Sequence, residues 1–352
     1  MIVKNEEKVL ARCLESVKSV VDEIIIVDTG SSDTTKEIAA RFTDKIYDFE
    51  WCDDFSAARN FAFSKAGCDY IMWLDADDIL LKNDREKLCL LMQDSDGSAD
   101  VIMLPYNTAF DENGAPLFSF YRERIVKRSK GFTWKGRVHE AIEYGGNVIY
   151  SDAAVTHRSV KKQYSTRNLD IYLKQESLGE PFTPRDQFYF GRELYYHGHY
   201  ERAAEVLNNF LDENKGWLEN NIEACKILSF CYTQTGNSKE AFHALCRSFI
   251  YDSPRAEICC EIGNLLMREN RYAQAKFWFA TALGMQPDAI SGAFVSAACY
   301  GYITAIQLAV CFDRTGDVET ARKYNELAGA IKPDSAAYQH NKAYFDSLSG
   351  NA

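Results

Sequence analysis

Three carboxylates stand within four positions of the sequence, at the end of the apolar stretch of residues 71–78, IMWLDADD. The side chains of Asp75, Asp77 and Asp78 would repel one another unless a cation neutralised them. Carboxylate oxygens of this kind are the ligands that Mg²⁺ and Mn²⁺ prefer. A single aspartate would be enough to cap the helix predicted just after them. The spacing therefore predicts a divalent-metal site.

A further acid, Asp28, ends the apolar run of residues 23–28, EIIIVD. Gly30 follows it and permits a tight turn into the next helix. These residues leave two interpretations open. Either Asp28 accepts a hydrogen bond from a nucleobase in a pocket of backbone, or the segment is an ordinary strand–turn–helix connection.

One stretch of the chain is strongly basic although the protein as a whole is acidic. Residues 121–137 hold seven basic residues and one acid in 17 positions, while the formal net charge of the chain is −11. The overall charge argues against general nucleic-acid binding, which depends on a field of lysine and arginine. A local anionic ligand and a solvated basic face are the two interpretations of the stretch. Its basic residues are Arg122, Arg124, Lys127, Arg128, Lys130, Lys135 and Arg137.

The elements that must position these side chains alternate through the first half of the chain. Apolar runs predict strands over residues 23–28, 44–49, 70–76 and 101–106, and segments of helical periodicity separate them. Strands separated by helices call for a Rossmann-like α/β domain with a mostly parallel sheet covered on both faces. Ligands of open α/β sheets bind beyond the carboxyl ends of the strands, where the acids above are expected to lie.

The second half of the chain loses the strand signal and gains a repeat. Four alanines take the same place in four similar segments, at intervals of 38, 34 and 46 residues. Turn glycines or asparagines precede them and prolines follow them, a pattern that resembles the tetratricopeptide repeat. We expect an all-α domain of about four repeats over residues 186–352, after a connecting helix and linker over residues 159–185. The alanines are Ala203, Ala241, Ala275 and Ala321.

Length and composition limit the domain count and the compartment. With 352 residues, 46% of them hydrophobic, the chain can form more than one domain with a large core. Its apolar runs stay below the roughly 20 residues that span a bilayer, and the start of the chain shows no basic-then-apolar leader. The eleven cysteines form no CxxC pair, which predicts reduced thiols in the core. We therefore expect a cytoplasmic protein.

Four blocks occur in order along the first half of the chain: MIVKNEEKVLARCLESV, DEIIIVDTGSSDTTKEIA, DDFSAARNFAFSKA and YIMWLDADD. Together they resemble family 2 glycosyltransferases of the GT-A fold. The resemblance is strongest over residues 1–110 and continues to about residue 158, and a tetratricopeptide tail occurs in a subgroup of these enzymes. It implies a nucleotide-sugar donor, for which we expect a UDP-sugar, and Mn²⁺ or Mg²⁺ as cofactor. Members usually carry several apolar residues before the first block, so the first strand is expected to be short or trimmed.

The resemblance implies donor-binding residues. Asp28 matches the aspartate that reads the base, and the backbone around Val3 and Asn5 would line the same pocket. Arg59 matches a basic residue near the diphosphate. The donor site is thereby expected at the ends of the first two strands and on the helix of the third block.

The resemblance also implies a metal site. Asp75 and Asp77 match the DxD pair, with Asp77 as the direct metal ligand, and Asp78 faces either metal or sugar in the donor site. His157 resembles a late histidine that completes the metal shell in some of these enzymes, and a structural, hydrogen-bonded histidine is the alternative.

The general base of an inverting transfer has to deprotonate the acceptor as it attacks, and a carboxylate suits a hydroxyl. Glu140 is the predicted base, and Asp111 and Glu143 are alternatives. No carboxylate cluster is evident beside His197 and His199, so we expect no metal role for them. Contacts with the acceptor or the diphosphate are predicted for Arg122, Arg124, Trp134, Arg137 and His139, with core packing as the alternative for Trp134 and a structural role for His139.

The sequence thus predicts an inverting, metal-dependent glycosyltransferase whose acceptor is a peptide, a protein or a surface glycan. The repeats would present or recruit that acceptor, and a homodimer through them stays open. A non-catalytic tetratricopeptide scaffold with a nucleotide-binding domain is the main alternative, although an inactive site has no physical reason to keep repelling carboxylates. A nucleotidyltransferase would need a glycine-rich phosphate loop after the first strand, and MIVKNEEKVLARC contains none.

Overall fold

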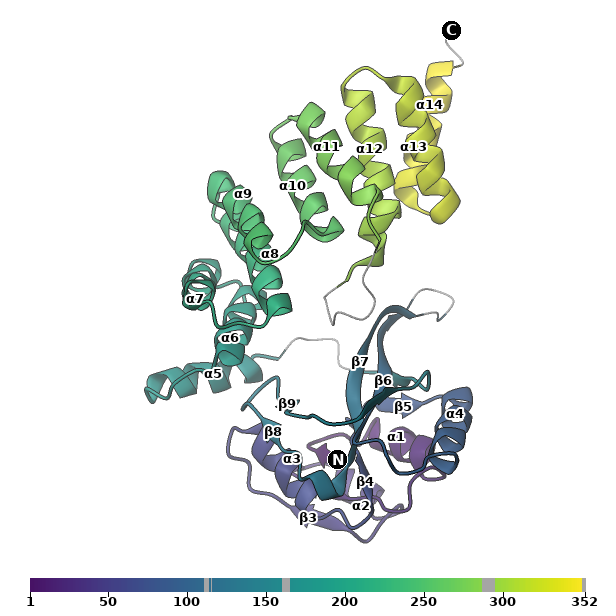
Figure 1. Ribbon diagram of the computed structural model, residues 1–352, viewed down its shortest axis with the longest axis vertical. Coiled ribbons are helices and arrows are strands. Elements are labelled where there is room, and N and C mark those ends of the chain that lie inside the picture. Colours follow the sequence, from purple (N-terminus) through teal and green to yellow (C-terminus); the bar gives the residue numbers. More distant parts are fainter. Residues whose placement is uncertain (111–113, 115, 160–164, 287–294, 350–352) are drawn as a thin grey trace. The chain divides into compact units, whose positions relative to one another are not determined.

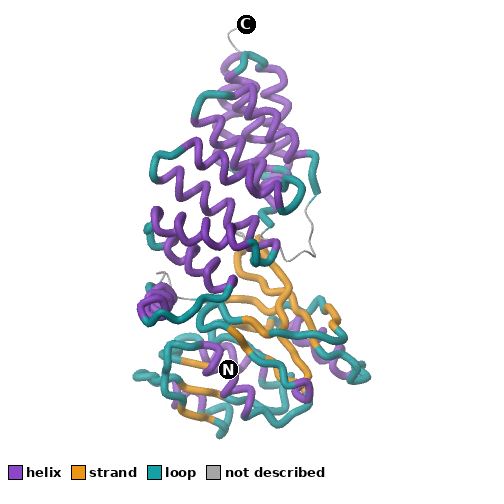
Figure 2. The backbone as a smooth tube through the Cα atoms, turned by 60° about the vertical axis from the view of Figure 1, so that its left-hand side comes forward, coloured by secondary structure: helices purple, strands orange, loops and turns teal. Residues whose placement is uncertain are grey.

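The chain forms two compact units, Met1–Pro181 and Phe182–Ala352, in the computed structural model (Figure 1). The structure describes residues 1–110, 114, 116–159, 165–286 and 295–349. Strands and helices combine in the first unit, whereas the described part of the second unit is helical (Figure 2). This confirms the predicted order of an α/β domain followed by an all-α domain.

A small parallel sheet begins the first unit. It has the order β1-β2-β3, and all of its pairs are parallel. The helices α1 (Leu10–Val17) and α2 (Thr35–Ala39) connect its strands. Only the last three residues of the predicted strand over residues 23–28 are extended, and the first strand is short, as expected. The strands are β1 (Ile2–Val3), β2 (Ile26–Asp28) and β3 (Ile46–Asp48).

A larger sheet follows, with the order β4-β7-β6-β11-β5 and with β10 paired to β6. It is mixed, because β6 and β7 form a long antiparallel pair while β10 and β11 run parallel to β6. The apolar segment after residue 147 gives two strands, β10 and β11. The strands are β4 (Tyr70–Met72), β5 (Asp78–Leu80), β6 (Val101–Phe110), β7 (Pro116–Lys127), β10 (Val148–Tyr150) and β11 (Val155–His157).

Both faces of this sheet are buried. On β6, Ile102 and Leu104 lie in one core cluster together with Leu88 of α4 (Lys82–Gln93). Val101 and Met103 point to the opposite face and lie in a second cluster with Trp73 and Trp134. Each fully buried aliphatic side chain of this size stabilises the fold by about 1.5–3 kcal/mol. The burial of alternate residues on both faces explains the continuous apolar run and fixes where the strands end.

Two helices and a two-stranded sheet also belong to the first unit. The helix α3 (Phe55–Ser64) packs against β8 (Trp134–Lys135), which pairs with β9 (Ala141–Ile142). The helix α5 (Arg167–Ser177) lies within the predicted connecting segment and belongs to this unit. Residues 160–164 of that segment lie outside the described residues.

The second unit consists of helix pairs followed by α14 (Ala336–Ser349). The four alanines that define the repeat are fully buried, one in the second helix of each pair. The residues five positions before them, Gly198, Gly236, Asn270 and Gly316, have the positive φ that closes the turn within each pair. The tetratricopeptide prediction is therefore confirmed. The pairs are α6 (Pro184–Tyr196) with α7 (Tyr200–Glu213), α8 (Leu218–Gln234) with α9 (Ser238–Arg247), α10 (Ala256–Arg268) with α11 (Tyr272–Leu283), and α12 (Tyr302–Arg314) with α13 (Val318–Ile331).

Two sequence expectations concern the whole chain. All eleven cysteines are free, as predicted, and seven of them are buried. In the part of the chain that the structure describes, no helix is both long and apolar enough to span a bilayer.

Candidate active site

A cavity of about 450 Å³ opens in the first unit at the carboxyl ends of β1 and β4. Its walls come from segments that are far apart in the sequence, so the fold brings together residues that were predicted separately. The predicted site residues that line it are Val3, Arg59, Asp75, Asp77, Arg122, His139 and Glu140.

Arg59 of α3 joins two of the predicted acids. Its Nη2 donates to Asp75 Oδ1 at 2.8 Å, and its Nε donates to Glu140 Oε1 at 2.5 Å. The guanidinium lies over the rings of Trp73 and Trp134, 5.2 and 4.8 Å from their centroids. Burial would raise the pKa of Asp75, but the charges of Arg59 and Arg124 outweigh it and lower that pKa to about 2. Asp75 is therefore a carboxylate fixed by an arginine.

Asp77, Asp78 and His157 form a cluster that can hold a metal ion, with one ligand atom of each within 4.8 Å of the others. The antiparallel pairing of β5 with β11 places His157 opposite Asp78. Carboxylate oxygens with one imidazole nitrogen suit Mn²⁺ or Mg²⁺. The structure thus brings together Asp77, Asp78 and His157, all three of which were predicted for the metal or donor site, whereas the carboxylate of Asp75 pairs with Arg59 instead.

Asp78 is the buried centre of this cluster. Its side chain and that of Arg124 are both 0% exposed, and they form an ion pair of 3.0 Å. Asp78 Oδ1 accepts from the Tyr106 hydroxyl at 2.9 Å, and its Oδ2 accepts from the backbone N–H of Asp75 at 3.0 Å. Asp78 therefore holds the loop that carries the other two aspartates. A contact with the donor would require Asp78 to line the cavity, and it does not.

The Tyr106 hydroxyl also lies 3.0 Å from His157 Nδ1. Burial and the charge of Asp78 raise the pKa of Tyr106, so its single proton stays and is donated to the carboxylate. His157 Nδ1 also lies 3.5 Å from Asp77 Oδ1 and 3.4 Å from Asp78 Oδ1, so this nitrogen faces both acids. The hydrogen bond to Asp78 raises the pKa of His157.

Asp28 closes the turn after β2 and keeps one oxygen unused. Its Oδ1 accepts from the backbone N–H groups of Gly30 and Ser31 at 2.9 and 2.8 Å. Its Oδ2 is buried and has no hydrogen-bond partner in the described part of the chain. Asn5 accepts from the N–H of Ser32 at 2.8 Å and so ties the end of β1 to the same turn. A buried, unpartnered carboxylate oxygen suits a ligand N–H donor.

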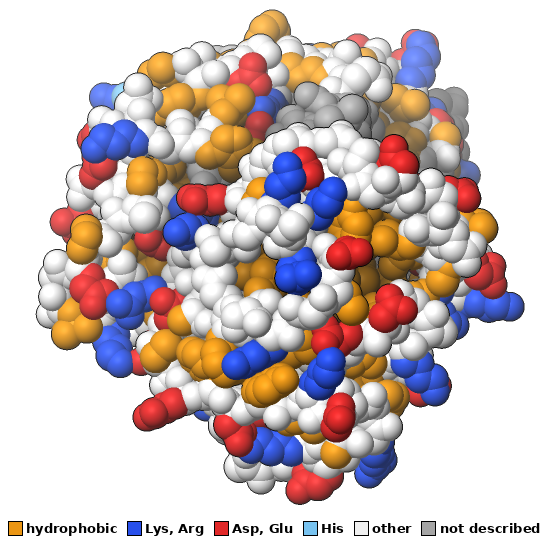
Figure 3. Space-filling view, turned by 60° about the horizontal axis from the view of Figure 1, so that its bottom comes forward, with side chains coloured by type: hydrophobic (Ala, Val, Ile, Leu, Met, Phe, Trp, Pro, Cys, Tyr) orange, Lys and Arg blue, Asp and Glu red, His pale blue; other side chains and the backbone are white. Residues whose placement is uncertain are grey.

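Most of the basic stretch makes structural contacts. Arg124 is buried with Asp78, Arg137 pairs with Glu180 at 2.5 Å, and Lys130 pairs with Asp100 at 3.1 Å. Arg122 is the residue of this stretch that lines the cavity, with its guanidinium 4.9 Å from the centroid of Trp73. Basic and acidic side chains are interspersed on the face that Figure 3 shows. The site therefore does not draw on the stretch as a whole.

Several other predicted residues lie apart from the cavity or outside the described residues. Trp134 is 1% exposed and its ring packs edge-on against Trp73 at 4.8 Å, which fits core packing. Glu143 is exposed, and Asp111 falls outside the described residues. His197 lies beside Glu193 in the second unit, and the metal-ligand cluster found among the described residues does not include it.

The cavity also contains residues that sequence reasoning missed. Trp51 and Phe55 line it and stack edge-on at 4.8 Å, and Thr29 lies beside the end of β1. Arg167 and Asn168 reach it from α5. Phe55 precedes Arg59 by one helical turn, a spacing that could have indicated it, but nothing in the sequence of α5 points to the cavity.

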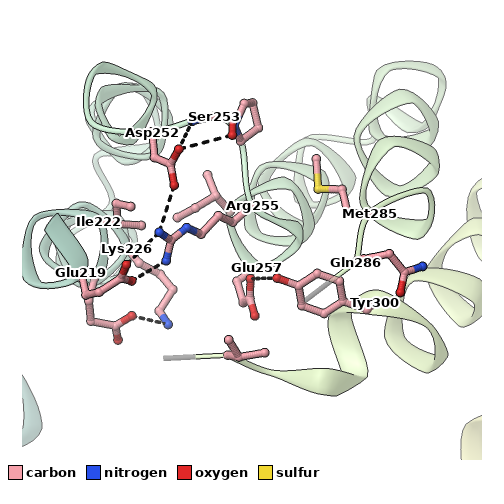
Figure 4. Close-up of a pocket in the computed structure, with 14 residues that line it drawn as sticks. Glu219, Ile222, Lys226, Asp252, Ser253, Arg255, Glu257, Met285, Gln286 and Tyr300 are labelled. Carbon is pink, nitrogen blue, oxygen red and sulfur yellow. Dashed lines mark hydrogen bonds and ion pairs between the residues drawn. The ribbon is translucent and has the colours of Figure 1, made fainter. Parts of the chain in front are cut away.

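A second cavity, of about 440 Å³, lies in the helical unit between α8, α10 and the segment around Tyr300. Its charged side chains bind one another: Arg255 pairs with Glu219 at 2.9 Å and with Asp252 at 3.0 Å, and the Tyr300 hydroxyl donates to Glu257 at 3.1 Å (Figure 4). Apolar side chains such as Ile222 and Ile258 fill out the wall. This cavity offers a binding surface, while the acids suited to catalysis gather in the first unit.

Comparisons with protein families agree with this division. The model of Glycosyl transferase family 2 matches residues 1–158, and the Tetratricopeptide repeat model matches residues 256–289. Among solved structures, that of MamA is similar to the helical part, with a TM-score of 0.38 at 16% identity, over 50% of this chain and 89% of MamA.

Individual relatives are named either for the repeat or for a glycosyltransferase. A TPR repeat-containing protein of Synechococcus elongatus is 52% identical over 81 residues, which are 23% of this chain and 20% of the relative. Glycosyltransferase SunS of Bacillus phage SPbeta is 29% identical over 252 residues, covering 67% of this chain and 58% of SunS. The lipopolysaccharide core biosynthesis glycosyltransferase LpsC of Rhizobium meliloti is 27% identical, covering 64% of this chain and 90% of LpsC. The chain therefore spans only part of the first two relatives.

Proposed function

We propose that this chain, whose residues 1–158 form a glycosyl transferase family 2 domain, is an inverting, metal-dependent glycosyltransferase. It moves a sugar from a nucleotide-sugar to a peptide, protein or surface-glycan acceptor. The observation that carries the proposal is the single cavity that collects Arg59, Asp75, Asp77 and Glu140 from distant parts of the chain. Charged groups gathered in this way are typical of a reaction centre.

The donor base lies at the ends of β1 and β2. The free Oδ2 of Asp28 accepts an N–H of the base, and the backbone beside Val3 and Asn5 lines the pocket. Uracil offers one N–H donor between two carbonyls, so we propose a UDP-sugar as donor. Arg122, at the cavity wall, then faces the diphosphate.

Asp77 and His157 would hold the divalent ion, Mn²⁺ or Mg²⁺, with Asp78 behind them. When bound, the ion would stabilise the negative charge that develops on the departing diphosphate. Arg59 keeps Asp75 ionised and in place beside these ligands. Asp78, through Arg124 and Tyr106, keeps the loop and the ring of His157 in position.

Glu140 takes the proton from the acceptor hydroxyl as that oxygen attacks the sugar. One of its oxygens accepts from Arg59, and among the described residues none donates to the other oxygen. The arginine fixes the direction of the carboxylate, so the second oxygen is aimed at the acceptor. A base held in this way needs no movement during the reaction.

The acceptor is bound with the help of the tetratricopeptide unit. Such arrays offer extended surfaces for other molecules, and this one contains a cavity lined by both charged and apolar side chains. The name of LpsC gives lipopolysaccharide core biosynthesis as its process, so a surface glycan stays among the acceptors we propose. Eleven free thiols favour a reducing compartment, which supports a cytoplasmic reaction.

Donor hydrolysis tests the proposal. The purified chain with Mn²⁺ is incubated with UDP-sugars and other nucleotide-sugars, and the released nucleoside diphosphate is measured. We expect turnover of at least one donor, its loss in Asp77→Asn, and normal activity in Asp44→Asn, which changes an exposed aspartate outside the cavity. Absence of turnover by the unaltered chain with every donor would favour the scaffold alternative. Mass spectrometry of candidate acceptors incubated with the active donor then identifies the acceptor.

A further inference from the structure

The helix α5 contributes to the catalytic cavity although it lies beyond residues 1–158, which match the family model. It is firmly attached to the first unit, because Leu169, Ile171 and Tyr172 are buried. The Tyr172 hydroxyl donates to the carbonyl of Val138 at 3.4 Å. Val138 lies two residues before Glu140, so α5 is fixed beside the segment that carries the proposed base.

Arg167, the first residue of α5, projects into the cavity wall. Its guanidinium carbon lies 4.6 Å from the ring centroid of Phe55, another residue of that wall. No carboxylate in the described part of the chain forms an ion pair with it. A stacked guanidinium with unused N–H donors is already oriented for a planar anion, so little side-chain entropy is lost when one binds.

The other two arginines that line the cavity already form ion pairs with carboxylates. Arg59 is bound by both Asp75 and Glu140, and Arg122 has a looser ion pair with Glu123 at 3.3 Å. The acids of the cavity, among them Glu140, Glu6 and Asp75, act on the charge of Arg167 from a distance. A cation held near several acids but paired with none can contribute its full set of donors to a ligand.

We propose that Arg167 is a diphosphate-binding residue of the donor site and that α5 is a working part of the catalytic domain. This inference rests on the proposed function, since it concerns the leaving group of the same reaction. The guanidinium donates two N–H groups to phosphate oxygens, as is usual for arginine with phosphate. Arg122 and Arg167 then hold the diphosphate from two walls, and a divalent ion held by Asp77 and His157 would neutralise the remaining charge.

Calorimetry on the full chain tests the inference. It measures the affinity for UDP and for uridine in the presence of Mn²⁺. Arg167→Gln should weaken UDP binding about 10-fold. This is the lower end of the effect expected for losing hydrogen bonds to a charged group, because the site is open to solvent. Uridine lacks phosphate, so its binding should not change. Arg167→Lys keeps the positive charge but lacks the paired N–H donors of the guanidinium, so it should lose less UDP affinity than Arg167→Gln. The difference between wild type and Arg167→Gln in UDP affinity should shrink as salt rises.

Arg202→Gln is the matched control. Arg202 is an exposed arginine of the helical unit that lies over a phenylalanine, Phe190, at 5.7 Å, and its replacement should leave UDP binding unchanged. Equal UDP affinity in wild type and Arg167→Gln would overturn the inference and leave the proposed function standing. Equal losses of UDP and uridine binding would also overturn it, because Arg167 would then only hold α5 in place. If the wild type binds none of UDP, GDP, ADP, CDP and dTDP, both the inference and the proposed function are wrong.

Discussion

Arg59 binds both Asp75 and Glu140, with N–O distances of 2.8 and 2.5 Å. The first acid follows a strand of the large sheet, and the second belongs to a segment 65 residues later in the chain. One arginine therefore sets the spacing between the loop that carries the metal ligands and the proposed base. Its charge also compensates two carboxylates that would otherwise repel each other.

Replacing Arg59 by methionine should cost stability as well as activity. The change keeps much of the apolar contact with Trp73 and Trp134 but leaves Glu140 buried without its partner. Breaking a buried pair costs about 3–5 kcal/mol, and we expect the lower end because the side chain of Asp75 is 39% exposed. Urea unfolding of the full chain, followed by tryptophan fluorescence, measures the loss. An unchanged unfolding midpoint would show that the arginine does not hold these acids together in solution.

Neighbouring aspartates should respond in opposite ways to the same substitution. Asp78→Asn removes the charge that faces the fully buried Arg124, so we expect a loss of about 3–5 kcal/mol in unfolding free energy. Asp77→Asn affects a partly exposed ligand and should leave stability within about 0.5 kcal/mol while abolishing the activity that depends on Mn²⁺. Urea unfolding and Mn²⁺ titration of both variants test this contrast. Equal destabilisation by the two substitutions would contradict the assignment of Asp78 as the buried centre of the cluster.

The sequence predicted the fold class because periodicity is a local property. Alternate burial on β6 and the alanines of the repeat both follow from the spacing of apolar residues. The sequence also placed Asp28, Asp75 and Asp77 at strand ends, where the chain turns into the site. These features depend on few distant contacts.

The partners of the site residues could not be predicted in the same way. Arg122 and Arg124 both lie over Trp73, at 4.9 and 3.9 Å from its centroid, yet only Arg124 is fully buried and paired with Asp78. Alternation along a strand gives the face of a side chain, but its burial depends on what packs over that point of the sheet. The position of α5, and with it Arg167, depends on tertiary contacts such as that of Tyr172 with Val138.

The helical unit should be sensitive to a single methyl group at its closest helix contacts. A Cβ atom at Gly263 of α10 would lie 2.6 Å from the ring of Phe279, a residue of α11 that is fully buried. We expect Gly263→Ala to lower the free energy of unfolding by about 1–3 kcal/mol, the usual cost of overpacking a core. Gly284→Ala is the control, since its Cβ would meet the nearest atom at 3.6 Å. Thermal unfolding of both variants decides, and equal melting temperatures would mean that α10 and α11 are not so closely packed.

Glu261 of α10 gives the helical unit a pH dependence. Burial raises the pKa of Glu261 above its ordinary value, against the opposing effects of Asn264, Lys226 and Arg268. The unfolded chain therefore releases this proton at lower pH than the folded chain does, and stability falls as the pH rises through that interval. Glu261→Gln removes the cost of burying this negative charge. It should therefore raise the melting temperature at pH 7 by about 2–4 °C for each kcal/mol of unfolding free energy recovered. The gain should disappear as the pH falls below about 4.3, where the carboxyl is protonated in both states.

Calorimetric scans of the full chain between pH 4 and 8 measure this gain in melting temperature, with Glu269→Gln as an exposed control. A gain that stays constant over this range would show that the charge of Glu261 is not penalised in the folded protein.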